Sequence, residues 1–131
     1  ISKHKQFQKG LKQLEEEGVM QIFYSPDHVR REPVLAAVGE LQFDVVMSRL
    51  ENEYGVKTTV ERMPHSLARW IVGDPAAISA VYWPSDTVRL VDQQGRGVML
   101  FTTDHLLAYC IKSNPSIKFL LREEVEQVTA H

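Results

Sequence analysis

The stretch from Phe43 to Tyr54 constrains the fold most, because its apolar residues follow the period of an α-helix. Residues at i, i+3, i+4, i+7 and i+11 share one helix face, and these positions hold Phe43, Val46, Met47, Leu50 and Tyr54. Arg49 and Glu53 form an i,i+4 pair on the polar side, and Gly55 is a natural stop. The pattern predicts an amphipathic helix that packs against other elements, with Asp44 as a capping carboxylate near its start.

The first half of the chain, residues 1–65, predicts the element order αββαβ. A helix is expected over Lys3–Glu17, where apolar residues recur at helical spacing before a glycine. Strands are expected at Val19–Ser25, Pro33–Val38 and Val56–Arg62, which are rich in β-formers or alternate apolar and polar residues. The amphipathic helix lies between the last two strands.

The second half, residues 66–131, predicts the order βαββαβ. Strands are expected at Leu67–Val72, Val88–Asp92, Val98–Thr102 and Ile117–Leu121. Asp74-Pro75 predicts the start of a short helix, and Thr103 or Asp104 predicts a helix that runs to Lys112. The polar stretch Glu124–His131 is expected to fray.

These orders indicate an α+β fold of two ferredoxin-like βαββαβ half-units, the first of which lacks its opening strand. We expect domains at 1–65 and 66–131 that pack together. The missing strand is normally central in its sheet. Either it lies upstream of Ile1, or Leu67–Val72 serves a sheet common to both halves, and the sequence leaves both alternatives open.

Composition limits the classes of function. The 131 residues include 15 Lys and Arg against 17 Asp and Glu, a formal charge of -2, so a nucleic acid would have to bind a local patch. One cysteine allows no internal disulfide and favours a reducing cytoplasm. Apolar runs fall well short of the ~20 residues that span a bilayer, so no membrane contact is expected.

The sequence offers no constellation for catalysis, a cofactor or a metal. It lacks the phosphate-binding loop G-x-x-x-x-G-K-[ST], and its five histidines lack metal-ligand spacing. Cys110 is expected to be a buried structural thiol. Trp70 and Trp83 could stack on RNA bases, but an apolar strand and a helix end favour core positions.

Cations in loops or at strand ends are the candidate binding residues, because they can meet phosphate groups without disturbing a core. They are Arg30, Arg31, Lys57, Arg62, Arg89 and Arg96. Arg96, in the glycine-flanked hairpin loop Gln93–Gly97, is the preferred candidate. A merely solubilising role is the alternative for each.

Short segments along the chain resemble a family of ribosomal proteins. Gly39–Val46, followed by Arg49-Leu50 and Glu53–Val56, resembles the third domain of translational GTPases such as elongation factor G. Leu41–Val46 together with Phe7–Leu11 and Ala68–Trp70 resembles the bacterial class II peptide chain release factors more closely. In the second half, the segments with this resemblance are Leu100-Phe101, Leu107–Tyr109 and Asn114–Phe119.

The resemblance implies a non-catalytic C-terminal part of a GTP-dependent release factor that recycles class I release factors in translation termination. It implies that GTP or GDP, with magnesium, binds an N-terminal domain absent from this chain. The implied partners are the ribosome, mainly its small subunit, and the GTPase and second domains of the same protein. The candidate cations would then contact ribosomal RNA or ribosomal proteins.

Three alternatives stay open at this point. The chain could be a domain of elongation factor G or of a ribosome-protection GTPase. It could be a stand-alone ferredoxin-like module that binds a small ligand between its repeats. A small hydrolase of the acylphosphatase kind would need Arg96 and Asn114 to converge on a phosphate, which their positions in the chain disfavour.

Overall fold

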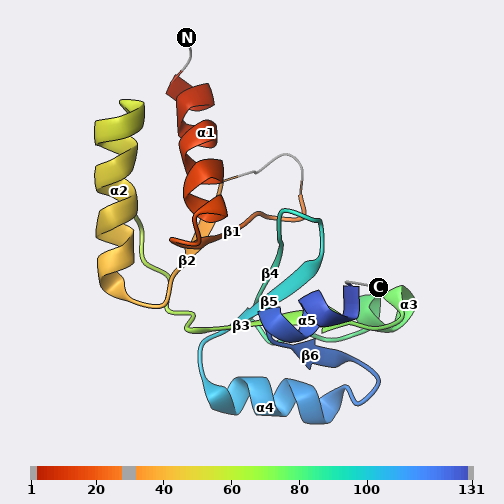
Figure 1. Ribbon diagram of the computed structural model, residues 1–131. Coiled ribbons are helices and arrows are strands. Elements are labelled where there is room, and N and C mark those ends of the chain that lie inside the picture. The colour runs from red at the N-terminus through yellow and green to blue at the C-terminus, as the bar shows by residue number, and fades with distance from the viewer. Residues whose placement is uncertain (1–2, 28–31, 130–131) are drawn as a thin grey trace. The chain divides into compact units, whose positions relative to one another are not determined.

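The computed structural model describes residues 3–27 and 32–129 as an α+β fold with two antiparallel sheets (Figure 1). The chain forms two compact units. The first unit comprises Ile1–Phe23 and Glu32–Arg62, and the second comprises Tyr24–Arg31 and Met63–His131. The domain boundary expected between residues 65 and 66 stays a prediction, and the two units are described separately.

The first unit contains two helices and a short hairpin. Its elements, in chain order, are α1 (Lys3–Glu16), β1 (Gln21–Phe23), β2 (Val34–Ala36) and α2 (Glu40–Tyr54). β1 and β2 pair antiparallel, with Ile22 opposite Leu35. The helices lie side by side (Figure 1). Leu11 and Leu14 of α1 and Val46 and Leu50 of α2 are 0–2% exposed, so the expected amphipathic helix is confirmed.

A glycine lets the two helices approach closely. A Cβ at Gly10 would lie 2.6 Å from Leu50 Cδ2 and 3.0 Å from a ring carbon of Tyr54. Glycine in a helix interior is unfavourable by about 0.8–1 kcal/mol relative to alanine. Its presence in α1 is therefore explained by the space that α2 occupies.

Backbone and side-chain groups at its two ends define α2. Gly39 is the N-cap, and the Gln42 side-chain oxygen accepts from the amides of Val38 (2.7 Å) and Gly39 (3.2 Å). Gly55 ends the helix in the left-handed region, with φ of 70°. The capping role expected for Asp44 is wrong, because the helix begins at Glu40 and places Asp44 in its second turn.

The strand expected at Val56–Arg62 is wrong. This segment has no regular secondary structure, although Val56 is buried and the next residues are mostly exposed. A strand requires backbone hydrogen bonds to a neighbour, and no strand in the described ranges pairs with residues 56–62. The alternation of apolar and polar residues indicated an extended backbone, but such a pattern does not show whether a neighbouring strand is present.

The second unit has the predicted βαββαβ order, followed by a further helix. Its elements are β3 (Leu67–Val72), α3 (Pro75–Ser79), β4 (Val88–Val91), β5 (Gly97–Phe101), α4 (Asp104–Ser113), β6 (Lys118–Leu120) and α5 (Arg122–Thr129). The sheet order is β4-β5-β3-β6, antiparallel throughout. Because β3 lies between β5 and β6, it does not also serve the sheet of the first unit.

Local signals place the helices of the second unit. Asp74 accepts from the amide of Ala76 at 3.2 Å and is followed by proline at the first helical position. Thr103 Oγ1 accepts from the amide of Leu106 at 3.1 Å. Both expected helix starts are confirmed.

One face of this sheet carries a compact apolar core. Its buried members are Ile71, Met99, Phe101, Leu107, Cys110 and Ile117. α4 contributes Leu107 and Cys110 to it. Trp83 and Phe119 pack against it and meet edge to face, with ring centroids 6.0 Å apart.

The terminus expected to fray from Glu124 is instead helical as far as Thr129. Val125, within this polar stretch, is 2% exposed. Glu124 Oε1 accepts from the amide of Leu121 at 2.8 Å, and Arg122 pairs with Glu126 four residues later. One buried apolar side chain and local polar bonds therefore hold α5. None of the helices described is long and apolar enough to cross a membrane.

Candidate functional site

The structure places four of the six candidate cations, since Arg30 and Arg31 lie outside the described residues. Lys57 lies in the irregular segment after α2, and Arg89 lies on β4, where both are exposed. No acidic side chain in the described ranges pairs with either one. Lys57 and Arg89 thus have the accessible ammonium and guanidinium groups that a phosphate contact requires.

Arg62 has an acidic partner. Its guanidinium donates to the Glu40 carboxylate at the start of α2, and both side chains are about two-thirds exposed. Arg62 lowers the pKa of Glu40 and Glu40 raises that of Arg62. The pair is open to solvent, so the arginine remains accessible to a competing anion.

Arg96 is held by a buried carboxylate at the tip of the β4–β5 hairpin. Its Nε donates to Asp92 Oδ2 at 2.7 Å, and its backbone amide donates to Asp92 Oδ1 at 2.9 Å. The Asp92 side chain is 7% exposed, and that of Arg96 is 23% exposed. Arg96 therefore has a structural role at this turn, in addition to the phosphate contact predicted for it.

The Asp92 carboxylate accepts two further hydrogen bonds. The Trp70 indole Nε1 donates to Oδ2 at 2.9 Å, and the Gln94 amide donates to Oδ1 at 2.9 Å. Gly95 closes the turn by donating its amide to the Asp92 carbonyl, and it has a φ of 79° that favours glycine. The Asp92 carboxylate thus joins strand β3 to the hairpin turn.

Asp92 was not among the residues predicted to be functional, although the sequence contains a signal for it. Aspartate at the first position of a turn with glycine at the fourth is a common turn pattern, because the carboxylate accepts from amides further along the turn. Asp92 and Gly95 have this spacing. Its bond to Trp70, 22 residues away in the chain, follows only from the fold.

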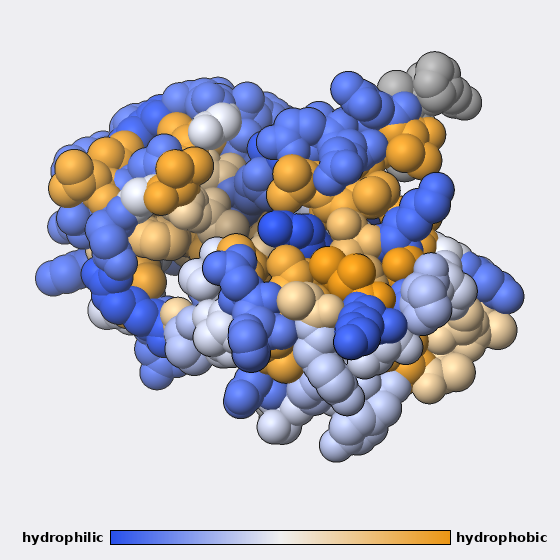
Figure 2. All heavy atoms as spheres, turned by 90° about the horizontal axis from the view of Figure 1, so that it is seen from below, coloured by the Kyte–Doolittle hydropathy of each residue, from blue (hydrophilic) through white to orange (hydrophobic). Residues whose placement is uncertain are grey.

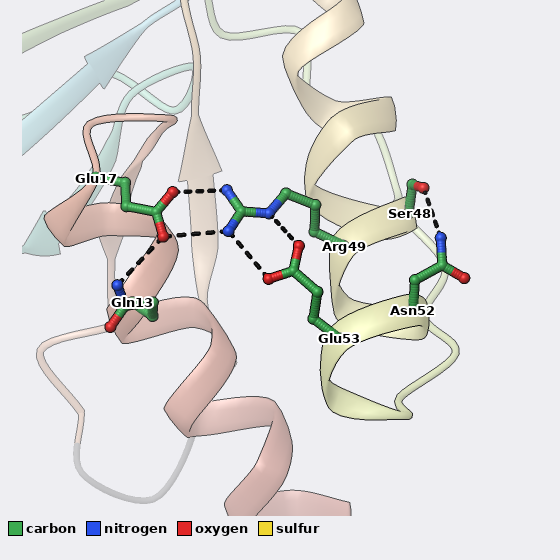
Figure 3. A network of polar contacts seen from close by, with 6 residues as sticks. All are labelled: Gln13, Glu17, Ser48, Arg49, Asn52 and Glu53. Atoms are coloured by element: carbon green, nitrogen blue, oxygen red, sulfur yellow. Dashed lines mark hydrogen bonds and ion pairs between the residues drawn. The ribbon is translucent and has the colours of Figure 1, made fainter.

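A second polar network joins the two helices of the first unit (Figure 3). Arg49 on α2 donates to Glu17, which follows α1, at 2.7 and 3.1 Å. It also donates to Glu53 at 2.6 and 3.1 Å. These bonds lower the pKa of both carboxyl groups and raise that of Arg49. Arg49 was expected on the polar side with Glu53, and its link to Glu17 is new.

The other side chains considered for chemistry are part of the packing. Cys110 is 1% exposed, and burial raises the pKa of its thiol. Trp70 is 4% exposed, as expected for a core residue. Within the described ranges, no three His, Cys, Asp or Glu residues gather as metal ligands. The face drawn in Figure 2 mixes hydrophilic and apolar side chains.

Comparison with known proteins identifies related sequences. A family model described as "Class II release factor RF3, C-terminal domain" matches residues 1–110. The chain is 48% identical to peptide chain release factor 3 of Cyanothece sp. (strain PCC 7425 / ATCC 29141) over 117 residues. The identity is 46% with the protein of that name from Nostoc punctiforme and 39% with that from Symbiobacterium thermophilum. Each alignment covers 89% of this chain and 22% of the relative.

Proposed function

Because the chain belongs to the family of the class II release factor RF3 C-terminal domain, we propose that it is part of a GTP-dependent release factor acting in translation termination. The family match over residues 1–110 carries this proposal. The chain spans about 22% of the length of the curated relatives it matches. The activity of the whole protein therefore belongs to the proposal.

The proposed role of this part is ribosome docking and coupling between domains, without catalysis. GTP or GDP, with magnesium, binds the N-terminal part of the longer protein, which works in the cytoplasm. The GTPase and second domains of the same protein contact this part and transmit the nucleotide state to it. The Arg49 network joins α1 and α2 within the first unit, and such a network suits this role because a rigid body transmits a displacement.

The proposed contact residues are exposed cations of the two units that meet ribosomal RNA or ribosomal proteins, mainly of the small subunit. Lys57 and Arg89 are the best-supported members, since both are exposed and neither pairs with an acid in the described ranges. Arg62 can contribute by exchanging Glu40 for a phosphate. Arg96 contributes only through the part of its guanidinium that Asp92 leaves accessible. Arg30 and Arg31 complete the proposed set.

The test of the function uses the full-length protein and ribosomes stalled after peptide release. We expect the protein to accelerate dissociation of a labelled class I release factor when GTP is present. We expect no acceleration when GTP is replaced by buffer alone. A version truncated before this chain should lose the acceleration while it still binds guanine nucleotide. Promotion of translocation without recycling would instead identify an elongation factor and overturn the proposal.

A further inference from the structure

Two arginines of the second unit lie in one row across its sheet. Arg69 on β3 and Arg89 on β4 are each opposite Met99 on β5, the strand that separates them (Figure 1). Residues directly opposite one another in neighbouring strands point to the same face of a sheet. Because neighbouring strands lie about 4.8 Å apart, the Cα atoms of the two arginines are separated by about 10 Å. Side chains as long as arginine can meet one ligand from that separation.

The face that the two arginines share also carries the apolar core of the second unit. Side chains alternate along a strand, so Leu67 and Ile71 are the neighbours of Arg69 on this face, and both pack in the core. Met99, between the two arginines, is 1% exposed. An apolar residue at position 69 would continue the core, whereas arginine brings a permanent positive charge to it.

The charge of Arg69 has no counterion within the part of the chain that the structure describes. Arg69 is half-buried, and its Nη1 donates to the carbonyl of Ala68, its neighbour in the chain, at 2.8 Å. The ion pairs among the described residues involve other arginines. A guanidinium carries five N–H donors, and burial of a charge is unfavourable unless the charge is paired. An anion at this place would remove that cost.

Arg89 adds a second positive charge at the border of the same face. It lies on β4, the strand at one end of the sheet order, and it is exposed. Like Arg69, it pairs with no acidic side chain of residues 3–27 and 32–129. The row thus presents two guanidinium groups that both lack an anionic partner in this part of the chain.

An RNA strand fits this row better than an acidic protein surface does. The planar guanidinium group matches the geometry of a phosphate, which it can bind through two hydrogen bonds. Every nucleotide of a strand carries a phosphate, so one strand can offer an anion to each arginine at once. A protein would have to bring two acidic side chains to the same spacing.

We propose that Arg69 and Arg89 form one binding site for the sugar-phosphate backbone of a ribosomal RNA strand. Arg69 supplies the half-buried charge and Arg89 the exposed one, and both hold phosphates of the same strand. Arg69 was not among the candidate cations, because its place in an apolar strand indicated a role in packing. The site rests on the proposed function, since that function supplies the ribosomal RNA.

Ribosome binding by the full-length protein tests the proposal. Arg69→Met and Arg89→Met keep an apolar stem and remove the guanidinium group. We expect each to weaken co-sedimentation with ribosomes about tenfold and to reduce the slope of log K against log salt by about 1. Arg122→Met is the matched control, because it removes an arginine that already pairs with Glu126, and it should leave both quantities unchanged.

Unfolding in urea separates this role from a purely structural one. Because Arg69 lacks a counterion, Arg69→Met should not lower the urea concentration at the unfolding midpoint, although it weakens ribosome binding. In Arg69→Lys the salt slope should return to that of the unmodified protein, since the charge is retained. Arg69→Gln takes the place of Arg69→Met in every comparison if the methionine variant does not fold.

Hydroxyl-radical footprinting of the ribosomal RNA identifies the ligand, because these radicals cleave exposed RNA backbone. We expect the unmodified protein to protect a backbone segment, and Arg69→Met and Arg89→Met to lose protection of the same nucleotides. Unchanged binding in Arg69→Met, or loss of protection at different nucleotides, would overturn the proposal. Weaker binding with an unchanged footprint would identify a ribosomal protein and also overturn it. These outcomes leave the proposed function intact, whereas failure of the unmodified protein to bind ribosomes would contradict both.

Discussion

The carboxylate of Asp92 shows how much one side chain contributes to the second unit. It accepts hydrogen bonds from Trp70 on β3 and from the backbone and side chain of Arg96 at the hairpin turn. A buried charge is tolerated when it is paired and its lone pairs are filled, and Asp92 meets both conditions. The predicted hairpin tip is therefore an anchored turn, and its bond to Trp70, 22 residues away in the chain, is the part that sequence spacing did not indicate.

Replacement of Asp92 should be strongly destabilising. We expect Asp92→Ala to lower the free energy of unfolding by about 3 kcal/mol, because it removes the carboxylate that accepts from the Trp70 indole and from the turn amides. Urea unfolding followed by tryptophan fluorescence measures the effect. Gln94→Ala is the control, since it removes only the exposed 3.3 Å bond from Arg96. A loss for Asp92→Ala equal to that of the control would contradict the role assigned here.

Gly10 leads to a prediction about a substitution that helix propensity alone would favour. Alanine gains about 1 kcal/mol in a helix, but its Cβ would lie 2.6 Å from Leu50 Cδ2, and overpacking costs about 1–3 kcal/mol. We expect Gly10→Ala to destabilise the chain by about 1 kcal/mol. The penalty should shrink in a Leu50→Ala background, as a double-mutant cycle in urea measures. A gain in stability in both backgrounds would show that α2 shifts to accommodate the alanine Cβ without loss of stability.

Whole elements were predictable where the signals are local. Asp74-Pro75, Gly18 and Gly55 mark helix ends within a few residues of chain, and the βαββαβ order of the second unit followed from such signals. The strand prediction for residues 56–62 was wrong because a strand depends on a partner far away in the sequence. The expectation of a frayed terminus in place of α5 was wrong because burial of Val125 depends on the sheet against which α5 packs. Among the candidate cations, exposure of Lys57 was predictable, but the Arg62–Glu40 pair joins residues 22 apart.

The link between α1 and α2 should depend on pH. Arg49 holds the pKa of Glu17 and Glu53 below the ordinary value of 4.5, so both carboxyl groups bind protons more readily in the unfolded chain. Their contribution to stability is fully present above pH 4.5 and is lost as the pH falls through the lower folded pKa values. We expect the urea concentration at the unfolding midpoint to decrease as the pH is lowered below about 4.5. In Arg49→Gln this decrease should be less steep.

The matched control for this pH profile is Arg122→Gln. It removes a single i,i+4 pair on α5, whereas Arg49→Gln removes bonds that join two helices. If the two variants flatten the acid limb equally, general surface charge accounts for the profile and the Arg49 network does not.

At the scale of the whole molecule, charge favours local contacts over a general attraction to RNA. The net charge of this chain is -2, so the ribosome binding proposed for it depends on individual cations. We expect Lys57→Gln and Arg89→Gln, in the full-length protein, each to weaken ribosome binding and to reduce the slope of log K against log salt by about 1. Binding measured by co-sedimentation at several salt concentrations gives both quantities.

Two exposed lysines outside the candidate set serve as controls for those variants. Lys9→Gln on α1 and Lys118→Gln on β6 remove the same kind of charge. If they change the slope as much as Lys57→Gln and Arg89→Gln do, the contacts are not confined to the proposed cations.

The buried position of the only cysteine makes this chain suitable for site-specific labelling. The Cys110 thiol is almost inaccessible, and burial raises its pKa. Because the thiolate is the form that attacks a maleimide, Cys110 should react very slowly with such reagents. A cysteine introduced in place of Tyr82, which is 86% exposed, would be the reactive thiol of this chain. Fluorophores could then be attached without first removing a native residue.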